Sequence, residues 1–118
     1  MDVLDRYVTA LRTQDWEALS ECLAQDVHRT GPYLDVVEGR ADYIAFLAGV
    51  IPGLLNYDIR LSRIDRLEGG AALVRLSEFV DIAGVRTEIP EALVFEFNSE
   101  GEISCVDVYL KQVAGSSS

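Results

Sequence analysis

The sequence predicts an α+β fold in which three N-terminal helices pack on one face of a strongly curved, mainly antiparallel sheet. Two observations lead to this prediction. Apolar residues recur at helical spacing through most of the first half of the chain, whereas residues 57–113 alternate between apolar and polar side chains and contain short turn motifs. Helices followed by hairpin-linked strands are typical of an α+β domain. A bent sheet covered by helices forms a cone-shaped barrel, and we expect an apolar hollow inside it.

Three helices are expected before residue 54. The first carries apolar side chains at positions 3, 4, 7, 8 and 11. Asp15 is suited to cap the second helix, because a short carboxylate accepts hydrogen bonds from the free N–H groups of the first turn. The inner face of that helix is expected to carry Trp16, Leu19, Cys22 and Leu23. The third helix begins near Arg40 and ends at Pro52-Gly53, with Ile44, Leu47 and Ile51 facing inward.

The remaining segments are expected to be strands. Val27–Thr30 forms a short strand that ends at Gly31-Pro32, because proline lacks the N–H that a strand ladder needs. Four strands follow residue 56, separated by turns at residues 69–70, 83–84 and 98–101. The last strand runs from Ile103 to Val113, so the domain spans residues 1–113. Residues 114–118 offer nothing to bury and are expected to be a disordered tail.

The composition argues against several classes of function. Twenty acidic and ten basic residues give a net charge of −10, which repels nucleic acid and anionic membranes. The N-terminus shows no pattern of basic and then apolar residues, so we expect a cytoplasmic protein. Cys22 and Cys105 are therefore expected to be reduced and separate. Two cysteines and one histidine without ligand spacing predict no metal site, and no cofactor is expected.

Short motifs through residues 3–112 make the chain resemble the SnoaL-like group of the nuclear-transport-factor-2-like (NTF2-like) superfamily. The resemblance implies the ketosteroid isomerase-like fold and a homodimer formed through the outer face of the sheet. The superfamily contains isomerases, epoxide hydrolases, cyclases and noncatalytic binding proteins. The matching motifs are Asp15-Trp16-Glu17-Ala18-Leu19, Ala24-Gln25-Asp26-Val27, Gly31-Pro32, Glu38-Gly39-Arg40, Val94-Phe95-Glu96-Phe97, Gly101-Glu102-Ile103 and Val108-Tyr109.

The resemblance implies roles for individual positions. Tyr7 stands where ketosteroid isomerases place the tyrosine that holds the enolate oxygen. Gly31 stands at the position of their base, and Leu93 stands at the position of their second oxygen-binding acid. Limonene epoxide hydrolases use two acids and an arginine on neighbouring strands. Here Glu78 is near the first acid position, whereas Leu76 and Val108 occupy the other two.

Polar residues on apolar strand faces are the best site candidates. Glu78 continues the series Ala72, Val74, Leu76 and Val80 at a period of two, so its carboxyl is expected to face inward. A carboxyl buried among alkyl groups has a raised pKa, which suits a general acid or base. There are two alternatives to a functional role for Glu78. It pairs with an arginine, for which Arg29 is a candidate, or a bulge turns it to solvent. Glu91 shares a face with Leu93, unless a bulge at Pro90 changes the phase.

The other candidates are a histidine, a loop and a few aromatic residues. His28 is the only histidine, and we consider it as a proton donor or as a structural residue. Tyr33 and Asp35 follow Gly31-Pro32 on a loop expected to border the cavity, or they form an ordinary turn. Trp16 and Leu93 are considered as substrate contacts, and Trp16 and Tyr7 also suit the core.

Two functions are the main candidates, and a pure dimerisation domain, which a filled cone without a cavity would favour, is a third. The first is an isomerase, cyclase or hydrolase that applies acid–base chemistry to a small apolar molecule, with Glu78, Tyr7 and His28 as catalytic residues. The second is a dimeric module that binds such a molecule without changing it. A cavity with several converging ionisable groups favours the enzyme, and a cavity with one isolated polar group favours the binding module.

Overall fold

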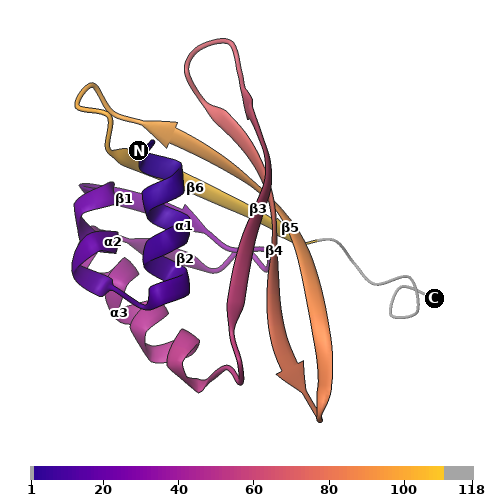
Figure 1. The fold of residues 1–118 in the computed structure, drawn as a ribbon. Coiled ribbons are helices and arrows are strands. Elements are labelled where there is room, and N and C mark those ends of the chain that lie inside the picture. The colour runs from indigo at the N-terminus through magenta and orange to yellow at the C-terminus, as the bar shows by residue number, and fades with distance from the viewer. Residues whose placement is uncertain (1, 111–118) are drawn as a thin grey trace.

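A computed structural model describes residues 2–110 and shows the α+β architecture expected from the sequence (Figure 1). The helices lie together on one face of a six-stranded sheet, and the opposite face of the sheet has no helical cover within the described residues. The elements are α1 (Val3–Thr13), α2 (Trp16–Cys22), β1 (Leu23–Thr30), β2 (Val36–Glu38), α3 (Arg40–Val50), a short 3-10 helix η1 (Ile51–Gly53), β3 (Asp58–Arg66), β4 (Ala72–Ile82), β5 (Val85–Phe97) and β6 (Ile103–Leu110).

The sheet is mixed and mostly antiparallel, and it is curved but not closed. The strand order is β2-β1-β6-β5-β4-β3, and only the β1–β6 pair is parallel. The cone is therefore open along the edges formed by β2 and β3. The predicted tail at residues 114–118 and the end of the last strand at residues 111–113 lie outside the described residues.

Helix starts agree well with the sequence. Asp15 caps α2, and its Oδ1 accepts a hydrogen bond from the Ala18 N–H at 3.1 Å. The third helix begins at Arg40 as expected. Its most deeply buried side chain is Tyr43, which packs with α1 and was not among the predicted inward residues.

The first strand differs from the prediction. It begins at Leu23 rather than Val27, and Leu23 was wrongly assigned to the inner face of the second helix. Leu23 and Ala24 are both buried, and a short apolar run of this kind fits either a helix or a strand. The strand β2 was not predicted, because its three residues follow the Gly31-Pro32 turn and pair only with the end of β1.

Strands β4 and β5 form the long hairpin that positions the site. Their cross-strand pairs run without a register shift from Ala72–Phe95 to Ile82–Val85. The pairing passes directly through Pro90, which lies opposite Ser77. Because no bulge occurs there, Glu91 keeps the inward phase of Leu93 and Phe95.

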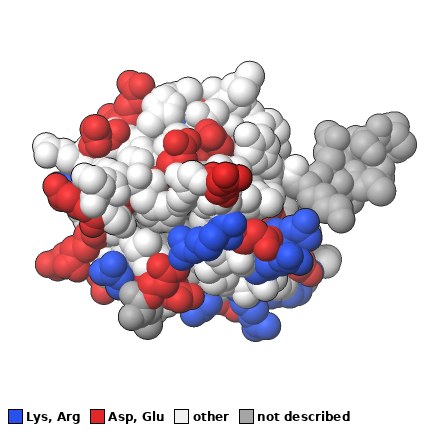
Figure 2. Space-filling view, turned by 90° about the horizontal axis from the view of Figure 1, so that it is seen from above, with Lys and Arg blue, Asp and Glu red and all other residues white. Residues whose placement is uncertain are grey.

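Acidic residues outnumber basic ones on this chain, and arginines pair with some of them. Several arginines form ion pairs with nearby acids, and Figure 2 shows basic side chains gathered in one part of the visible face with acidic side chains beside them. The ion pairs of β3 and its surroundings are Arg12–Asp58, Arg60–Asp58, Arg63–Asp65 and Arg66–Asp2. Within residues 2–110, no helix has the length and apolar character that crossing a membrane would require.

Candidate active site

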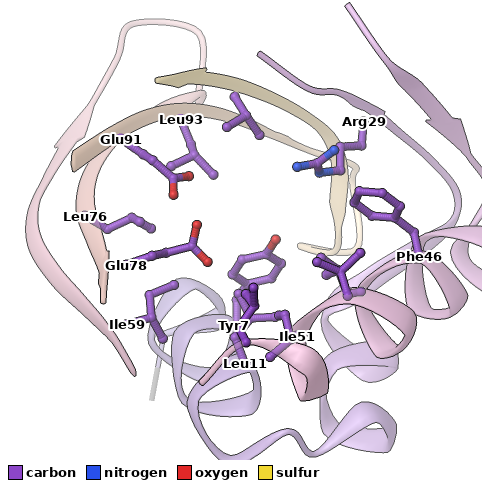
Figure 3. A pocket seen from close by; sticks show the side chains of 14 residues that line it. Tyr7, Leu11, Arg29, Phe46, Ile51, Ile59, Leu76, Glu78, Glu91 and Leu93 are labelled. Atoms are coloured by element: carbon purple, nitrogen blue, oxygen red, sulfur yellow. The ribbon is translucent and has the colours of Figure 1, made fainter. Parts of the chain in front are cut away.

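A cavity of about 180 Å³ lies between the inner face of the sheet and the helices α1 and α3. Most of its walls are aliphatic, and four polar side chains enter it (Figure 3). The polar ones come from α1, β1, β4 and β5, so the whole fold is needed to assemble them. The lining residues are Tyr7, Leu11, Arg29, Phe46, Leu47, Val50, Ile51, Leu54, Ile59, Leu76, Glu78, Glu91, Leu93 and Val108.

Two carboxyl groups form one wall of this cavity. Glu91 is the cross-strand partner of Leu76, and Glu78 is the partner of Ile89, so the two acids are diagonal neighbours on one face of the sheet. Their carboxyl groups point into the cavity and toward one another in Figure 3. Two neighbouring carboxyl groups in an apolar site resist ionising together, so the presence of Glu78 favours the protonated form of Glu91.

A hydrogen bond from Tyr57 fixes Glu78. The Tyr57 hydroxyl donates to Oε2 of Glu78 at 2.6 Å, a short hydrogen bond between two oxygen atoms. Burial, and then the adjacent Glu78 charge, raise the pKa of Tyr57 far above its ordinary value, so this hydroxyl keeps its proton. Glu78 is therefore held in place as a hydrogen-bond acceptor beside Glu91 (Figure 3).

Glu91 is the acid that carries the proton. Its side chain is buried, and its Oε2 has no hydrogen-bond partner among residues 2–110. Burial is the main cause that raises the pKa of Glu91 well above its usual range, and the neighbouring Glu78 raises it further. A buried oxygen without a partner is costly, and a bound molecule that forms a hydrogen bond with Oε2 of Glu91 removes that cost.

Arg29 provides a positive charge on the opposite wall. It lies across the cavity from the two acids in Figure 3, and its charge opposes the rise in the pKa of Glu91. Its guanidinium lies 5.0 Å from the centre of the Phe46 ring, and its Nη1 is 3.6 Å from Oδ2 of Asp35. Within the described part of the chain, the buried Nη1 makes no hydrogen bond, so Arg29 is only weakly neutralised.

The glycine before Pro32 makes room for the Asp35–Arg29 contact. A Cβ atom at Gly31 would collide with the Asp35 carboxylate, and the Gly31 N–H donates to the Asp35 carbonyl at 2.7 Å. A residue other than glycine at this position would displace the counterion of Arg29. Gly31 therefore supports the cationic wall, although it has no side chain with which to act as a base.

Two buried tyrosines connect α1 to α3 beneath the cavity. The hydroxyl oxygens of Tyr7 and Tyr43 lie 2.6 Å apart, and the Tyr7 ring packs edge-on against Phe95. Burial raises the pKa of Tyr43 to about 12. Burial and the nearby Tyr43 raise the pKa of Tyr7 well above its ordinary value. Both phenols are thus neutral hydrogen-bonding groups, and Tyr7 lines the cavity.

The structure brings only some of the predicted site residues together. Tyr7, Glu78, Glu91 and Leu93 line the cavity. His28 is outside the lining, where its Nδ1 is 3.3 Å from Oε1 of Glu38 and its side chain is 43% exposed.

The loop and helix candidates also lie away from the cavity walls. Tyr33 is 82% exposed, and Asp35 reaches the site only through Arg29. Trp16 is partly buried and packs against the core.

Sequence reasoning missed the role of Tyr57 and Tyr43. Tyr57 shares a strand face with Ile59 and Leu61, so its inward phase was visible, but the phase alone does not show that its hydroxyl meets Glu78. Arg29 was considered as a partner for an inward acid, and the structure places it facing that acid pair without an ion pair to it.

One further group of potential ligand atoms lies outside the cavity. A carboxylate oxygen of Glu96, the thiol of Cys105 and a carboxylate oxygen of Asp107 lie within 4.8 Å of one another on β5 and β6. Burial, and then the neighbouring acids, raise the pKa of the Cys105 thiol. This shift opposes formation of the thiolate that a metal requires, so we assign no metal to this group. Cys22 and Cys105 are both free.

The chain belongs to the SnoaL-like domain family, within the NTF2-like superfamily, because the family model matches residues 4–106. No curated protein sequence matches the chain.

Solved structures agree with the family assignment at the level of the fold. An epoxide hydrolase of the LEH-like type from M. tuberculosis is 19% identical, with 92% of this chain and 80% of that chain covered and a TM-score of 0.77. SalBIII, an epoxide hydrolase/cyclase-like enzyme of pyran ring formation in the polyether salinomycin, is 19% identical, with coverages of 93% and 88% and a TM-score of 0.80. A protein with a ketosteroid isomerase-like fold from Catenulispora acidiphila DSM 44928, in complex with trimethylamine, is 16% identical, with coverages of 91% and 83% and a TM-score of 0.78.

The raised pKa of Glu91 predicts a pH-dependent loss of stability. The folded protein retains a proton that the unfolded chain releases near the free glutamate pKa of about 4.3. The free energy of unfolding should therefore fall as the pH rises above that value, by at most about 1.4 kcal/mol per pH unit for one proton. Glu91→Gln should flatten the curve of unfolding free energy against pH, measured by urea denaturation.

Glu100→Gln is the matched control for this experiment, because Glu100 lies on an exposed turn and keeps its backbone hydrogen bond to Asn98. Its stability curve should follow that of the wild type. A Glu91→Gln curve with the wild-type slope between pH 5 and pH 8 would show that Glu91 is ionised in the folded protein.

The Tyr7–Tyr43 hydrogen bond predicts coupled mutational effects. Either Tyr7→Phe or Tyr43→Phe leaves the other buried hydroxyl without its partner, at a cost of about 1–3 kcal/mol. The double variant removes both hydroxyls, so it should lose less stability than the sum of the single variants. Thermal or urea unfolding of the four proteins measures the coupling, and the exposed Tyr33→Phe serves as the neutral control. Strict additivity would contradict the hydrogen bond.

Proposed function

We propose that the protein is an acid–base enzyme that acts on a small, largely apolar molecule bearing an oxygen atom, as an isomerase, cyclase or hydrolase. One observation carries the proposal: two neighbouring carboxyl groups, Glu91 and the hydrogen-bonded Glu78, enter an apolar cavity that faces Arg29 (Figure 3), and burial raises the pKa of Glu91. Neighbouring groups with separated proton affinities are the usual basis for distinct acid and base roles.

The two acids divide the chemistry between them. Glu78 is the base, which takes a proton from carbon, from a substrate hydroxyl or from water. Glu91 is the acid, which gives its proton to the substrate oxygen. Because the two carboxyl groups are neighbours, the proton gained by Glu78 can return to Glu91 and restore the starting state.

Arg29 and Tyr7 support the same step. Negative charge that develops on the substrate oxygen is attracted by the Arg29 guanidinium, whose field is strong in an apolar cavity. The Tyr7 hydroxyl lines the cavity and is already polarised by its hydrogen bond with Tyr43. His28 lies outside the lining, so we assign it no catalytic role in this proposal.

The size of the cavity limits the substrate. Its volume of about 180 Å³ compares with an engineered protein cavity of about 150 Å³ that binds benzene. Pockets for drug-sized ligands measure about 300–1,000 Å³. We therefore propose that the part of the substrate held between the acids and Arg29 is about the size of a single ring.

Two of the structural relatives support this class of chemistry. The M. tuberculosis protein and SalBIII are named for epoxide hydrolysis or cyclisation. Both reactions supply a proton to an oxygen and remove a proton from a nucleophile, which are the roles proposed for Glu91 and Glu78. The noncatalytic binding module remains the second candidate, because most of the cavity wall is aliphatic.

Turnover of one-ring probes tests the enzyme. We expect the wild type to act on cyclohexene oxide, styrene oxide or 3-cyclohexenone, and Glu78→Gln to lower kcat by about 10²–10⁴-fold, the usual contribution of a general base. Gas chromatography measures the products. Glu100→Gln should retain the wild-type rate.

Two results would contradict the enzyme. Wild-type rates equal to the uncatalysed rates for all three probes, with binding of the same compounds retained, would favour the binding module. A rate that is unchanged in both Glu78→Gln and Glu91→Gln would remove the acid pair from the mechanism.

We also propose that the protein forms a homodimer through the outer face of its sheet. That face has no helical cover within residues 2–110, and it carries Tyr109, which is 58% exposed opposite Ala92. Sedimentation should give twice the chain mass of 13.0 kDa, and Tyr109→Asp should shift the protein toward monomer. Tyr33→Asp, on an exposed loop, should leave the dimer intact. A wild-type monomer at micromolar concentration would contradict this proposal.

A further inference from the structure

We propose that the cavity continues past Glu78 into an apolar groove that binds a hydrocarbon chain, so that the substrate combines a compact oxygen-bearing head with an apolar tail. This inference rests on the proposed function for the identity of the head. The groove has a volume of about 430 Å³, more than twice that of the cavity.

The groove follows from the pairing of β4 and β5. Beyond Glu78, the inner face of β4 continues with Val80 and Ile82, and Ile89 lies on the same face of β5. The hairpin extends past the helices in Figure 1, so this part of the face is covered only by the segment between η1 and β3. The lining residues are Gly53, Leu54, Leu55, Tyr57, Glu78, Val80, Asp81, Ile82, Ala83 and Ile89.

The groove and the cavity share two side chains. Leu54 and Glu78 line both spaces, and Tyr57, which donates to Glu78, lines the groove. Glu78 thus stands at the boundary, where it reaches a molecule that occupies both. A ligand whose oxygen lies between Glu78 and Glu91 can extend past Glu78 along Val80 and Ile82.

The groove is apolar and lacks cover in the described structure. Leu55 is 66% exposed and Ile82 is 53% exposed, which is unusual for two large aliphatic side chains that border one hollow. Its other charged residue, Asp81, is already bonded to Asn56 and Arg86. An uncharged hydrocarbon chain fits these surroundings, whereas a charged or strongly polar tail finds no free partner among the lining residues.

A series of 4-alkylphenols tests the groove. Phenol supplies a ring of the size of the cavity and a hydroxyl for the acid pair, and ethyl, butyl and hexyl substituents extend it. Full burial of a methylene corresponds to about a fourfold gain in affinity. For the wild type we expect calorimetry to show about two- to fourfold tighter binding for each methylene, because the groove is partly open.

A variant of the groove separates its effect from that of the cavity. Leu55→Ser combined with Ile82→Ser removes exposed apolar side chains that do not line the cavity, so phenol should bind as to the wild type. In the double variant, the increase in the logarithm of the binding affinity per methylene should be less than half of the increase in the wild type. Leu67→Ser, at the exposed turn between β3 and β4, is the control and should keep the full gain.

The outcomes distinguish the groove from the proposed function. If Glu91→Gln changes the affinity for phenol but longer alkyl chains bind no more tightly than phenol, the groove proposal is wrong. The proposed role of the acid pair would still stand. A gain per methylene that survives the double substitution would also overturn it. If phenol does not bind, whereas the longer alkylphenols bind and the double variant weakens them, the groove proposal is supported. The proposal that the acid pair binds the oxygen-bearing head would then be wrong. A double variant that alters the oligomeric state would assign the groove to a second copy of the chain and overturn the proposal.

Discussion

Two carboxyl groups side by side in an apolar cavity lower the stability of the folded state, and several neighbouring side chains offset this loss. Burial and the neighbouring Glu78 raise the pKa of Glu91, so the pair resists carrying two negative charges. The charge on Glu78 is met by the Tyr57 hydroxyl at 2.6 Å, and Arg29 faces the pair from the other wall. Oε2 of Glu91 has no hydrogen-bond partner among the described residues, so the site retains an unsatisfied hydrogen-bonding atom for a ligand.

Local pattern was sufficient to predict most of the fold and the acid half of the site. The period-two alternation of β4 placed Glu78 inward, and the same rule placed Glu91 inward once Pro90 proved to lie within an unbroken ladder. Asp15 gave a clear helix start for the same reason, because capping depends on a few adjacent residues. These features require no knowledge of how distant segments meet.

The cationic half depended on long-range geometry that pattern does not encode. Arg29 lies on a strand whose alternation places His28 and Arg29 on opposite faces, and only the curvature of the sheet decides which face closes over the cavity. His28 was considered catalytic because of its residue type, but it pairs with Glu38 away from the cavity. Tyr43 and Tyr57 act through single hydroxyl contacts with residues at least 21 positions away in the chain.

The place of β6 in the sheet bears on the order in which the molecule can be assembled during synthesis. This strand, the last of the described chain, lies between β1 and β5, and its parallel pairing with β1 joins residues about 80 positions apart, such as Leu23 and Ile103. Until it inserts, the segment that carries Arg29 and the hairpin that carries the two acids have no strand between them. A nascent chain emerging from the ribosome therefore exposes both apolar faces until residue 110 is available, and such long-range pairing is characteristically slow. The pairing that joins the two halves of the cavity thus depends on the last strand to be synthesised among the described elements.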